Sequence, residues 1–184
     1  MTRTLTLSTA FTLALSQTAI AVGFNSDDPP TPTETTTECP EGTVWDAETE
    51  DCVEIEDSAL ATDPEALIAT VRELAYADRH RDALDLLALA PDPADTMVLT
   101  YLGYSTRSLG DFDRGLDYYD RALAADPDNL LARAYLGMAY VQLGAPEQAH
   151  VQLAEIRARG GEGRWPELAL AGALAAGDVT GYDY

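Results

Sequence analysis

Apolar and small residues recur at three- and four-residue spacing through the centre of the chain, which places them on one face of a helix. Two such segments follow each other, with these residues at Leu99, Leu102, Gly103, Thr106 and Leu109, and then at Leu116, Tyr119, Ala122 and Leu123. Between them, Gly110 suits the left-handed conformation that ends a helix, and Asp111 can accept amide hydrogens of the next first turn. Asp126-Pro127 predicts the end of the second helix, and Asn129 a cap for the next one. The pattern therefore predicts a helical hairpin.

This hairpin pattern is repeated along the chain. A shift of 34 residues aligns Leu102-Gly103 with Leu136-Gly137, Leu109-Gly110 with Leu143-Gly144, and Gly115 with Ala149. Small residues at matching places predict close helix crossings, where a larger side chain would force the helices apart. An internal repeat of this period is typical of stacked helical units. The alternative is an unrelated helical bundle with accidental periodicity.

The spacing of the signature positions resembles the tetratricopeptide repeat. These positions are Leu102-Gly103, Gly110, Gly115, Tyr119, Ala122 and Pro127. The family prefers Ala where Gly115 stands and an aromatic residue where Thr106 stands, so the match has two departures. The resemblance implies an all-α fold, a right-handed superhelix of about three helical hairpins with a C-terminal capping helix.

The repeat region is expected to span residues 63–177, with units at about 63–94, 95–129 and 130–163 and the capping helix at 164–176. Thr62-Asp63-Pro64-Glu65 has the residue types of a helix start, and the first helix is expected to run from Pro64 to about Ala77. The first unit lacks the Leu-Gly pair. A lone last helix would cover the apolar face that a stack of repeats leaves exposed.

The chain is strongly acidic, with a formal net charge of -21, 11 Arg and no Lys. Between Phe24 and Asp63 there are 13 acidic residues and no basic one. Such a chain is repelled by nucleic acid and by anionic membrane surfaces, so neither is expected as a partner. Its length suits one folded domain.

Residues 1–21 are expected to be a secretory signal peptide. Arg3 gives a positive start, an apolar stretch without charge follows, and Ala19-Ile20-Ala21 fits a signal peptidase site. The alternative is an uncleaved membrane anchor, although the stretch is rich in Ser, Thr and Gln. The protein is thus expected to be exported, to the periplasm of a Gram-negative bacterium or as a secreted protein. Residues 22–38, rich in Asp, Pro, Thr and Glu, predict a disordered extended linker.

Cys39 and Cys52 are the only cysteines and lie in a turn-rich segment, residues 39–55. In an exported protein they predict a disulfide and a small stapled hairpin, which is a structural staple or, alternatively, a glycan-binding element. Because the staple precedes Pro64, we expect it to fold separately from the helices. Too few metal ligands lie at suitable spacing to predict a zinc or calcium site.

No constellation typical of an enzyme is present in the sequence, so no catalytic, metal or cofactor residue is expected and the protein is predicted to be a non-enzyme. His80 and His150 are isolated candidates. The leading hypothesis is an adaptor, monomeric when free, that binds a peptide or helix of another protein. The alternative is a structural component of a cell-envelope complex. Size-exclusion chromatography distinguishes the two.

The resemblance also implies where a partner would bind. In tetratricopeptide proteins the first helix of each hairpin lines a concave groove. Matching positions here are Arg72, Tyr76, Met97, Thr100, Tyr104, Arg107, Ser108, Leu131, Ala134, Met138, Val141 and Gln142. Methionine and tyrosine would form an adaptable apolar strip, and the arginines could hold an acidic group. The alternative is that Met97 and Met138 are core residues.

Overall fold

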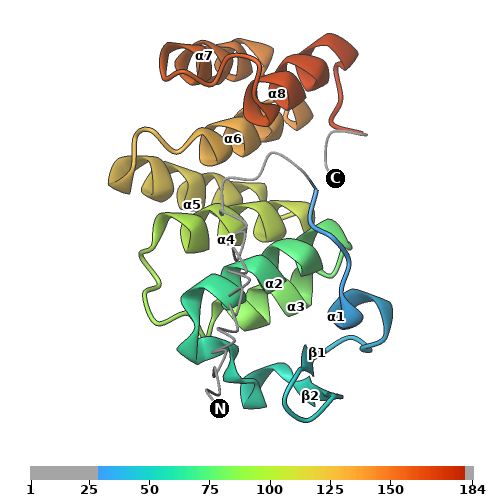
Figure 1. Cartoon of the computed structure of the whole chain (residues 1–184). Helices are drawn as coiled ribbons and strands as arrows, with labels where there is room; N and C mark the ends of the chain where they lie inside the picture. Colours follow the sequence, from blue (N-terminus) through green and yellow to red (C-terminus); the bar gives the residue numbers. More distant parts are fainter. Residues whose placement is uncertain (1–28, 181–184) are drawn as a thin grey trace, which may run out of the picture.

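The computed structural model describes residues 29–180. The predicted signal peptide and the first part of the predicted linker lie outside the described residues. Within them, three helical hairpins and a last helix are stacked one upon another (Figure 1). The helices are α2 (Pro64–Tyr76), α3 (His80–Leu87), α4 (Thr96–Ser108), α5 (Phe112–Ala125), α6 (Leu130–Gln142), α7 (Pro146–Ala158) and α8 (Trp165–Ala176). The predicted helical repeat fold is confirmed.

The helices begin and end where the sequence predicts, because capping side chains satisfy the free amides of their first turns. Asp63 accepts from the amides of Glu65 and Ala66, Asp111 caps α5, and Asn129 accepts from the amide of Ala132. Gly110, between α4 and α5, has a φ of 95°, a conformation that glycine adopts without strain. These local signals set the hairpin boundaries.

Two glycines allow neighbouring helices to approach closely. A Cβ atom on Gly103 would lie 2.6 Å from the Tyr119 ring, and one on Gly137 would lie 2.5 Å from the Leu170 side chain. Both distances are far shorter than van der Waals contact. The predicted close crossings are therefore present, within the second hairpin at Gly103 and between α6 and α8 at Gly137.

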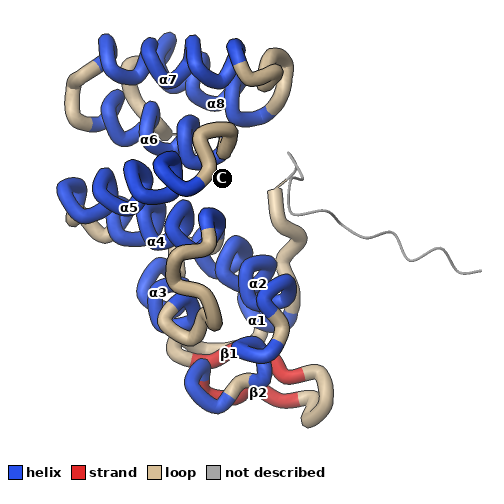
Figure 2. Tube along the Cα trace, turned by 90° about the vertical axis from the view of Figure 1, so that its left-hand side faces the viewer, coloured by secondary structure: helices blue, strands red, loops and turns tan. Residues whose placement is uncertain are grey.

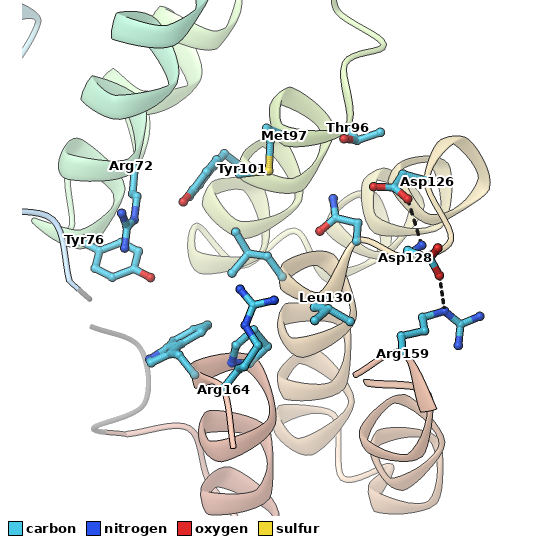
Figure 3. A pocket seen from close by; sticks show the side chains of 14 residues that line it. Arg72, Tyr76, Thr96, Met97, Tyr101, Asp126, Asp128, Leu130, Arg159 and Arg164 are labelled. Carbon is cyan, nitrogen blue, oxygen red and sulfur yellow. Dashed lines mark hydrogen bonds and ion pairs between the residues drawn. The ribbon is translucent and has the colours of Figure 1, made fainter. Parts of the chain in front are cut away.

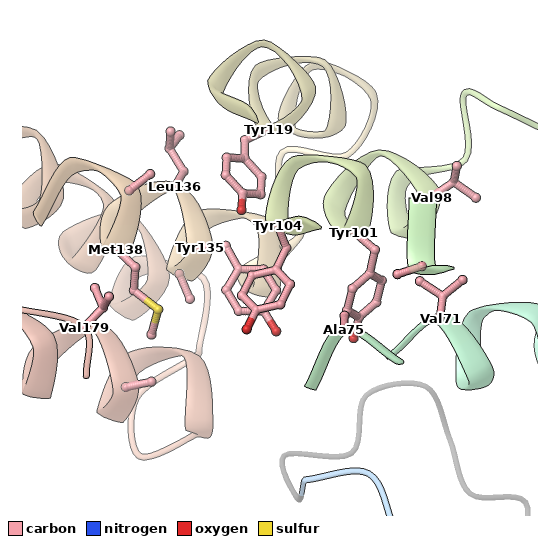
Figure 4. Close-up of a cluster of buried hydrophobic side chains, with 14 of the residues drawn as sticks. Val71, Ala75, Val98, Tyr101, Tyr104, Tyr119, Tyr135, Leu136, Met138 and Val179 are labelled. Atoms are coloured by element: carbon pink, nitrogen blue, oxygen red, sulfur yellow. The ribbon is translucent and has the colours of Figure 1, made fainter. Parts of the chain in front are cut away.

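The centre of the stack is filled by aromatic side chains (Figure 4). Tyr135 on α6 stacks on Tyr104 with ring centroids 4.7 Å apart and meets Trp165 edge-on at 5.9 Å. Its hydroxyl group lies 3.0 Å from that of Tyr76. Burial raises the pKa of Tyr135 well above its ordinary value, because a phenolate would lose its hydration there. The aromatic cluster joins all the hairpins into one core.

The disulfide hairpin is not separate from the helices, contrary to the sequence-based expectation. Its strands β1 (Thr43–Asp46) and β2 (Asp51–Glu54) are antiparallel, and Cys39 and Cys52 form the predicted disulfide. Two short 3-10 helices, η1 (Ile55–Asp57) and η2 (Ala59–Thr62), lead on to α2. Val44 and Ile55 are buried in the same hydrophobic cluster as the residues of the helices. The hairpin lies beneath α2 and α3 and closes that end of the stack (Figure 2).

Arg79, in the turn between α2 and α3, holds this N-terminal module, residues 29–57, in place. Its guanidinium group donates hydrogen bonds to the backbone carbonyl oxygens of Thr35, Cys39, Pro40 and Thr43, at 2.6 to 3.1 Å. The group also pairs with the buried Asp82 carboxylate at 2.6 Å. The other oxygen of that carboxylate accepts from the Gly42 amide. One side chain thus joins the module to the helices by polar contacts that no apolar pattern reveals.

The predicted disordered linker is wrong for its last part, where a short helix, α1 (Glu34–Thr37), packs against α2. The buried Glu73 of α2 accepts hydrogen bonds from the Thr33 amide and from the hydroxyl groups of Thr33 and Thr36. Threonines supply the donors that a buried carboxylate needs, so a segment without large apolar side chains still docks. Among residues 29–180, no helix is long and apolar enough to cross a membrane.

Candidate binding surface

A cavity of about 500 Å³ lies where α2 meets the first turns of α4, α6 and α8 (Figure 3). Its walls hold three arginines and three aromatic rings, and we call it the arginine cavity. The lining residues are Arg72, Tyr76, Thr96, Met97, Tyr101, Asp126, Asp128, Asn129, Leu130, Leu131, Arg159, Arg164, Trp165 and Pro166. A cavity of this size can hold several side chains of a peptide.

The repeat builds this cavity from equivalent positions. Met97, Leu131 and Trp165 are each 34 residues apart, and each lies at the start of the first helix of its unit. All three line the arginine cavity. Stacking therefore places one large apolar side chain from each unit after the first on the same surface.

Three arginines and two aspartates, Asp126 and Asp128, line the cavity, so its charged groups carry a small positive excess within an acidic chain. Arg72 on α2 lies over the Tyr76 ring at 5.5 Å, and Arg164 at the N-cap of α8 projects towards the same space (Figure 3). Arg159, on the opposite wall, is paired with Asp128 at 3.0 Å. Burial raises the pKa of Tyr101 above its ordinary value, and Arg72 opposes that rise.

Three helix N-termini, those of α4, α6 and α8, line the cavity. Asp95 and Asn129 cap α4 and α6 through their side chains, but no side chain of residues 29–180 caps α8, whose N-cap position is held by Arg164. Backbone amides and the helix dipole at such an end favour a negative group. Together with Arg72, this geometry favours a carboxylate as ligand.

A second cavity of about 410 Å³ lies beside the first, between the start of α2 and the α3–α4 loop. It is mainly apolar, and we call it the apolar cavity. Its lining consists of Pro64, Glu65, Leu67, Ile68, Ala90, Pro91, Asp92, Asp95, Met97 and Val98. Met97 lines both cavities, so the two are neighbours on one surface.

Four of the twelve predicted groove residues, Arg72, Tyr76, Met97 and Leu131, line the arginine cavity. Ser108 and Gln142 are exposed and lie outside both cavities. The other six are buried: Thr100, Tyr104, Arg107, Ala134, Met138 and Val141. Whether a partner contacts any of the twelve stays a prediction.

The burial of two of these six has a clear cause. Tyr104 is stacked on Tyr135 and is approached edge-on by His80 at 5.5 Å. Met138 is covered by Val179, which follows α8 and belongs to the same hydrophobic cluster (Figure 4). The groove positions of the central turns of α4 and α6 are thus filled by the protein itself, and the open surface lies at the first turns.

Sequence reasoning missed Arg164 and Trp165, because it treated the last helix only as a cap, and it also missed Arg159 at the end of α7. The signal was present in the repeat, since Trp165 follows Leu131 by 34 residues. Asp126 was assigned only to the end of a helix, and Asp128, to which no role was assigned, pairs with Arg159. Among the residues that the structure describes, no group of three His, Cys, Asp or Glu side chains could hold a metal ion.

Stacked helical hairpins with small residues at their crossings define the class of helical repeat proteins. A family model described as tetratricopeptide repeat matches residues 107–176, from the last turn of α4 to the end of α8. Comparison with curated proteins and with solved structures gave no match. Tetratricopeptide repeats in general mediate binding to other proteins.

Proposed function

We propose that this protein is a non-catalytic, exported adaptor that binds a segment of another protein in the arginine cavity. The observation that carries the proposal is the convergence of Met97, Leu131 and Trp165 on one open surface that also holds arginines. Aromatic and aliphatic anchors with a few placed donors are the usual lining of a binding site. The positive cavity in a chain of net charge -21 would select an anionic group of the ligand.

Site-specific photocrosslinking in the producing cell tests this proposal. A photoreactive amino acid at Leu131 faces the arginine cavity, whereas one at the exposed Ala154 on α7 is the matched control. The proposal expects a discrete adduct at Leu131 that is lost in Arg72→Glu, and none at Ala154. Adducts at Ala154 alone would place the partner on another face and refute the proposal.

Size-exclusion chromatography of the native extract separates an adaptor from an assembly component. An adaptor elutes mainly as a free monomer, while a permanent component of an envelope complex elutes only in a large species. The second result would replace the adaptor proposal with the structural role.

Export is supported by the Cys39–Cys52 disulfide, because such bonds persist in oxidising compartments. N-terminal sequencing of the purified protein tests it. A mature chain starting near Val22 is the expected result, and retention of residues 1–21 in a membrane fraction would contradict it.

A further inference from the structure

We propose that the arginine cavity and the apolar cavity form one site, which selects an extended segment with a basic-apolar end and an acidic end. This inference rests on the proposed function and specifies its ligand. Met97 joins the two cavities, and the charges at their edges have opposite sign. A ligand that fills both must carry the complementary charges in a fixed order.

The apolar cavity provides an anchor site. Leu67, Ile68 and Val98 form its floor and are almost completely buried, while the exposed Pro91 contributes to its rim. A Leu, Ile or Met side chain entering this space leaves water, which favours binding. An apolar surface of this kind recognises shape and hydrophobicity and does not specify charge.

The charge at its edge comes from three exposed carboxylates. Glu65, Asp92 and Asp95 all line the apolar cavity, and no arginine of the described part of the chain does. Two of the carboxylates accept backbone amide hydrogen bonds, Asp92 from Ala94 and Asp95 from Met97, which fixes their positions. A lysine or arginine next to the apolar anchor of the ligand would complement these carboxylates.

The two cavities lie along the same face of α2. Glu65 and Ile68 line the apolar cavity, and Arg72 and Tyr76 line the arginine cavity. These residues are three or four positions apart, so they form one stripe of the helix. The site is therefore a continuous path along α2, with Met97 of α4 facing it midway.

The length of this path sets the spacing in the ligand. From Ile68 to Tyr76 the helix advances roughly 12 Å at about 1.5 Å per residue. An extended peptide covers that distance in about three to four residues at roughly 3.3 Å each. The acidic residue is therefore expected about three or four positions from the apolar anchor.

Binding of defined peptides to the full chain tests the inference. The ligands are fluorescein-labelled ten-residue peptides on a Gly-Ser background. One complete peptide carries Arg-Leu and, three residues later, Glu-Phe, and the other complete peptide carries the two pairs in the reverse order. Two control half-peptides carry only Arg-Leu or only Glu-Phe, and the second of these is the acidic half-peptide. A further control peptide has both charges inverted. Fluorescence anisotropy at low salt gives the dissociation constants, and thermal melting verifies that each protein variant is folded.

The inference expects one of the two complete peptides to bind best and the charge-inverted peptide to bind least. Glu65→Arg should weaken binding of the complete peptide roughly 1.5- to fivefold, which is the scale of an exposed charge pair. The same variant should leave the acidic half-peptide unaffected. Arg72→Glu should weaken the binding of both the complete peptide and the acidic half-peptide. The matched control is Arg81→Glu, at an exposed position of α3.

Three results would overturn the inference in distinguishable ways. If the acidic half-peptide binds as well as the complete peptides and Glu65→Arg has no effect, the arginine cavity acts alone and the adaptor function still stands. If no peptide binds and Leu131 gives no crosslinked adduct, both the two-cavity site and the proposed function fail. Concentration-dependent dimerisation blocked by Met97→Trp would instead assign the surface to a second copy of the chain.

Discussion

Replacing Arg79 with alanine should destabilise the whole protein. The arginine side chain is 11% exposed and that of its partner Asp82 only 7%. Its loss would leave the Asp82 carboxylate buried without its cation and would remove the donor from four backbone carbonyl groups. Removing one partner of a buried ion pair costs about 3–5 kcal/mol.

For a domain of this size, that loss corresponds to a decrease in Tm of roughly 6–20 °C. Urea denaturation followed by circular dichroism gives the free energy of unfolding directly. Arg81→Ala, two residues away and exposed, is the control and should change Tm little. The double variant R79A/D82A removes the unpaired charge and should recover part of the loss.

The reasoning is refuted if Arg79→Ala melts like Arg81→Ala. That result would mean that the polar contacts of Arg79 contribute little to the stability of the protein. Limited proteolysis gives an independent measure. In Arg79→Ala, the cleavage rate of the segment before α2 should rise by a larger factor than that of the segment after α3.

Three further predictions follow from the same packing. Replacing Cys39 and Cys52 with serine should lower the Tm of the helices by roughly 6–12 °C. The disulfide closes a loop whose size contributes about 3 kcal/mol, and the hairpin shares the hydrophobic core of the helices. An unchanged Tm would show that the hairpin folds alone. Gly137→Leu should lower the free energy of unfolding, measured by chemical denaturation, by about 1–3 kcal/mol or more, because even a Cβ would overlap Leu170. A variant as stable as the native protein would contradict the close crossing of α6 and α8. The pKa values of Tyr101 and Tyr135 are raised in the folded protein, so their contribution to stability is complete below pH 10. Above pH 10 the unfolded chain loses these protons first, and the free energy of unfolding should fall by about 1.4 kcal/mol per pH unit for each tyrosine. The chain has no lysine to titrate there, and Tyr101→Phe should reduce the slope.

The helical part of the fold was predictable because its signals are local. Apolar spacing defined the helices, and Asp63, Gly110 and Asn129 marked their ends, as the structure confirms. Gly103 and Gly137 were predictable as close contacts because a repeat aligns them. Each of these inferences needs only residues within one or two neighbouring units.

The docking of the N-terminal module was not predictable in this way. Arg79 contacts backbone carbonyl oxygens 36 to 44 residues away, and a carbonyl oxygen carries no sequence signal. The sequence likewise marks Glu73 only as an ordinary helix residue, although its carboxylate accepts hydrogen bonds from the distant Thr33 and Thr36. Composition suggested disorder because it counts apolar side chains and overlooks such polar contacts.

The candidate site was predictable only in part, for a related reason. Family positions identified Arg72, Met97 and Leu131, which line the arginine cavity. The same rule selected Tyr104, which the structure buries because a second ring stacks on it from α6. Exposure depends on how successive units fill the space between them, and this cannot be read from one unit.

The positions of the two tryptophans make the two ends of this protein separately observable. Trp45 lies in β1 of the disulfide hairpin, and Trp165 lines the arginine cavity at the start of α8. Indole emission shifts in wavelength when the ring gains or loses contact with water. In the Trp45→Phe protein, emission would report on the cavity, and in the Trp165→Phe protein on release of the hairpin. Stopped-flow mixing with each variant would thus determine whether the two ends of the stack lose their structure together or in sequence.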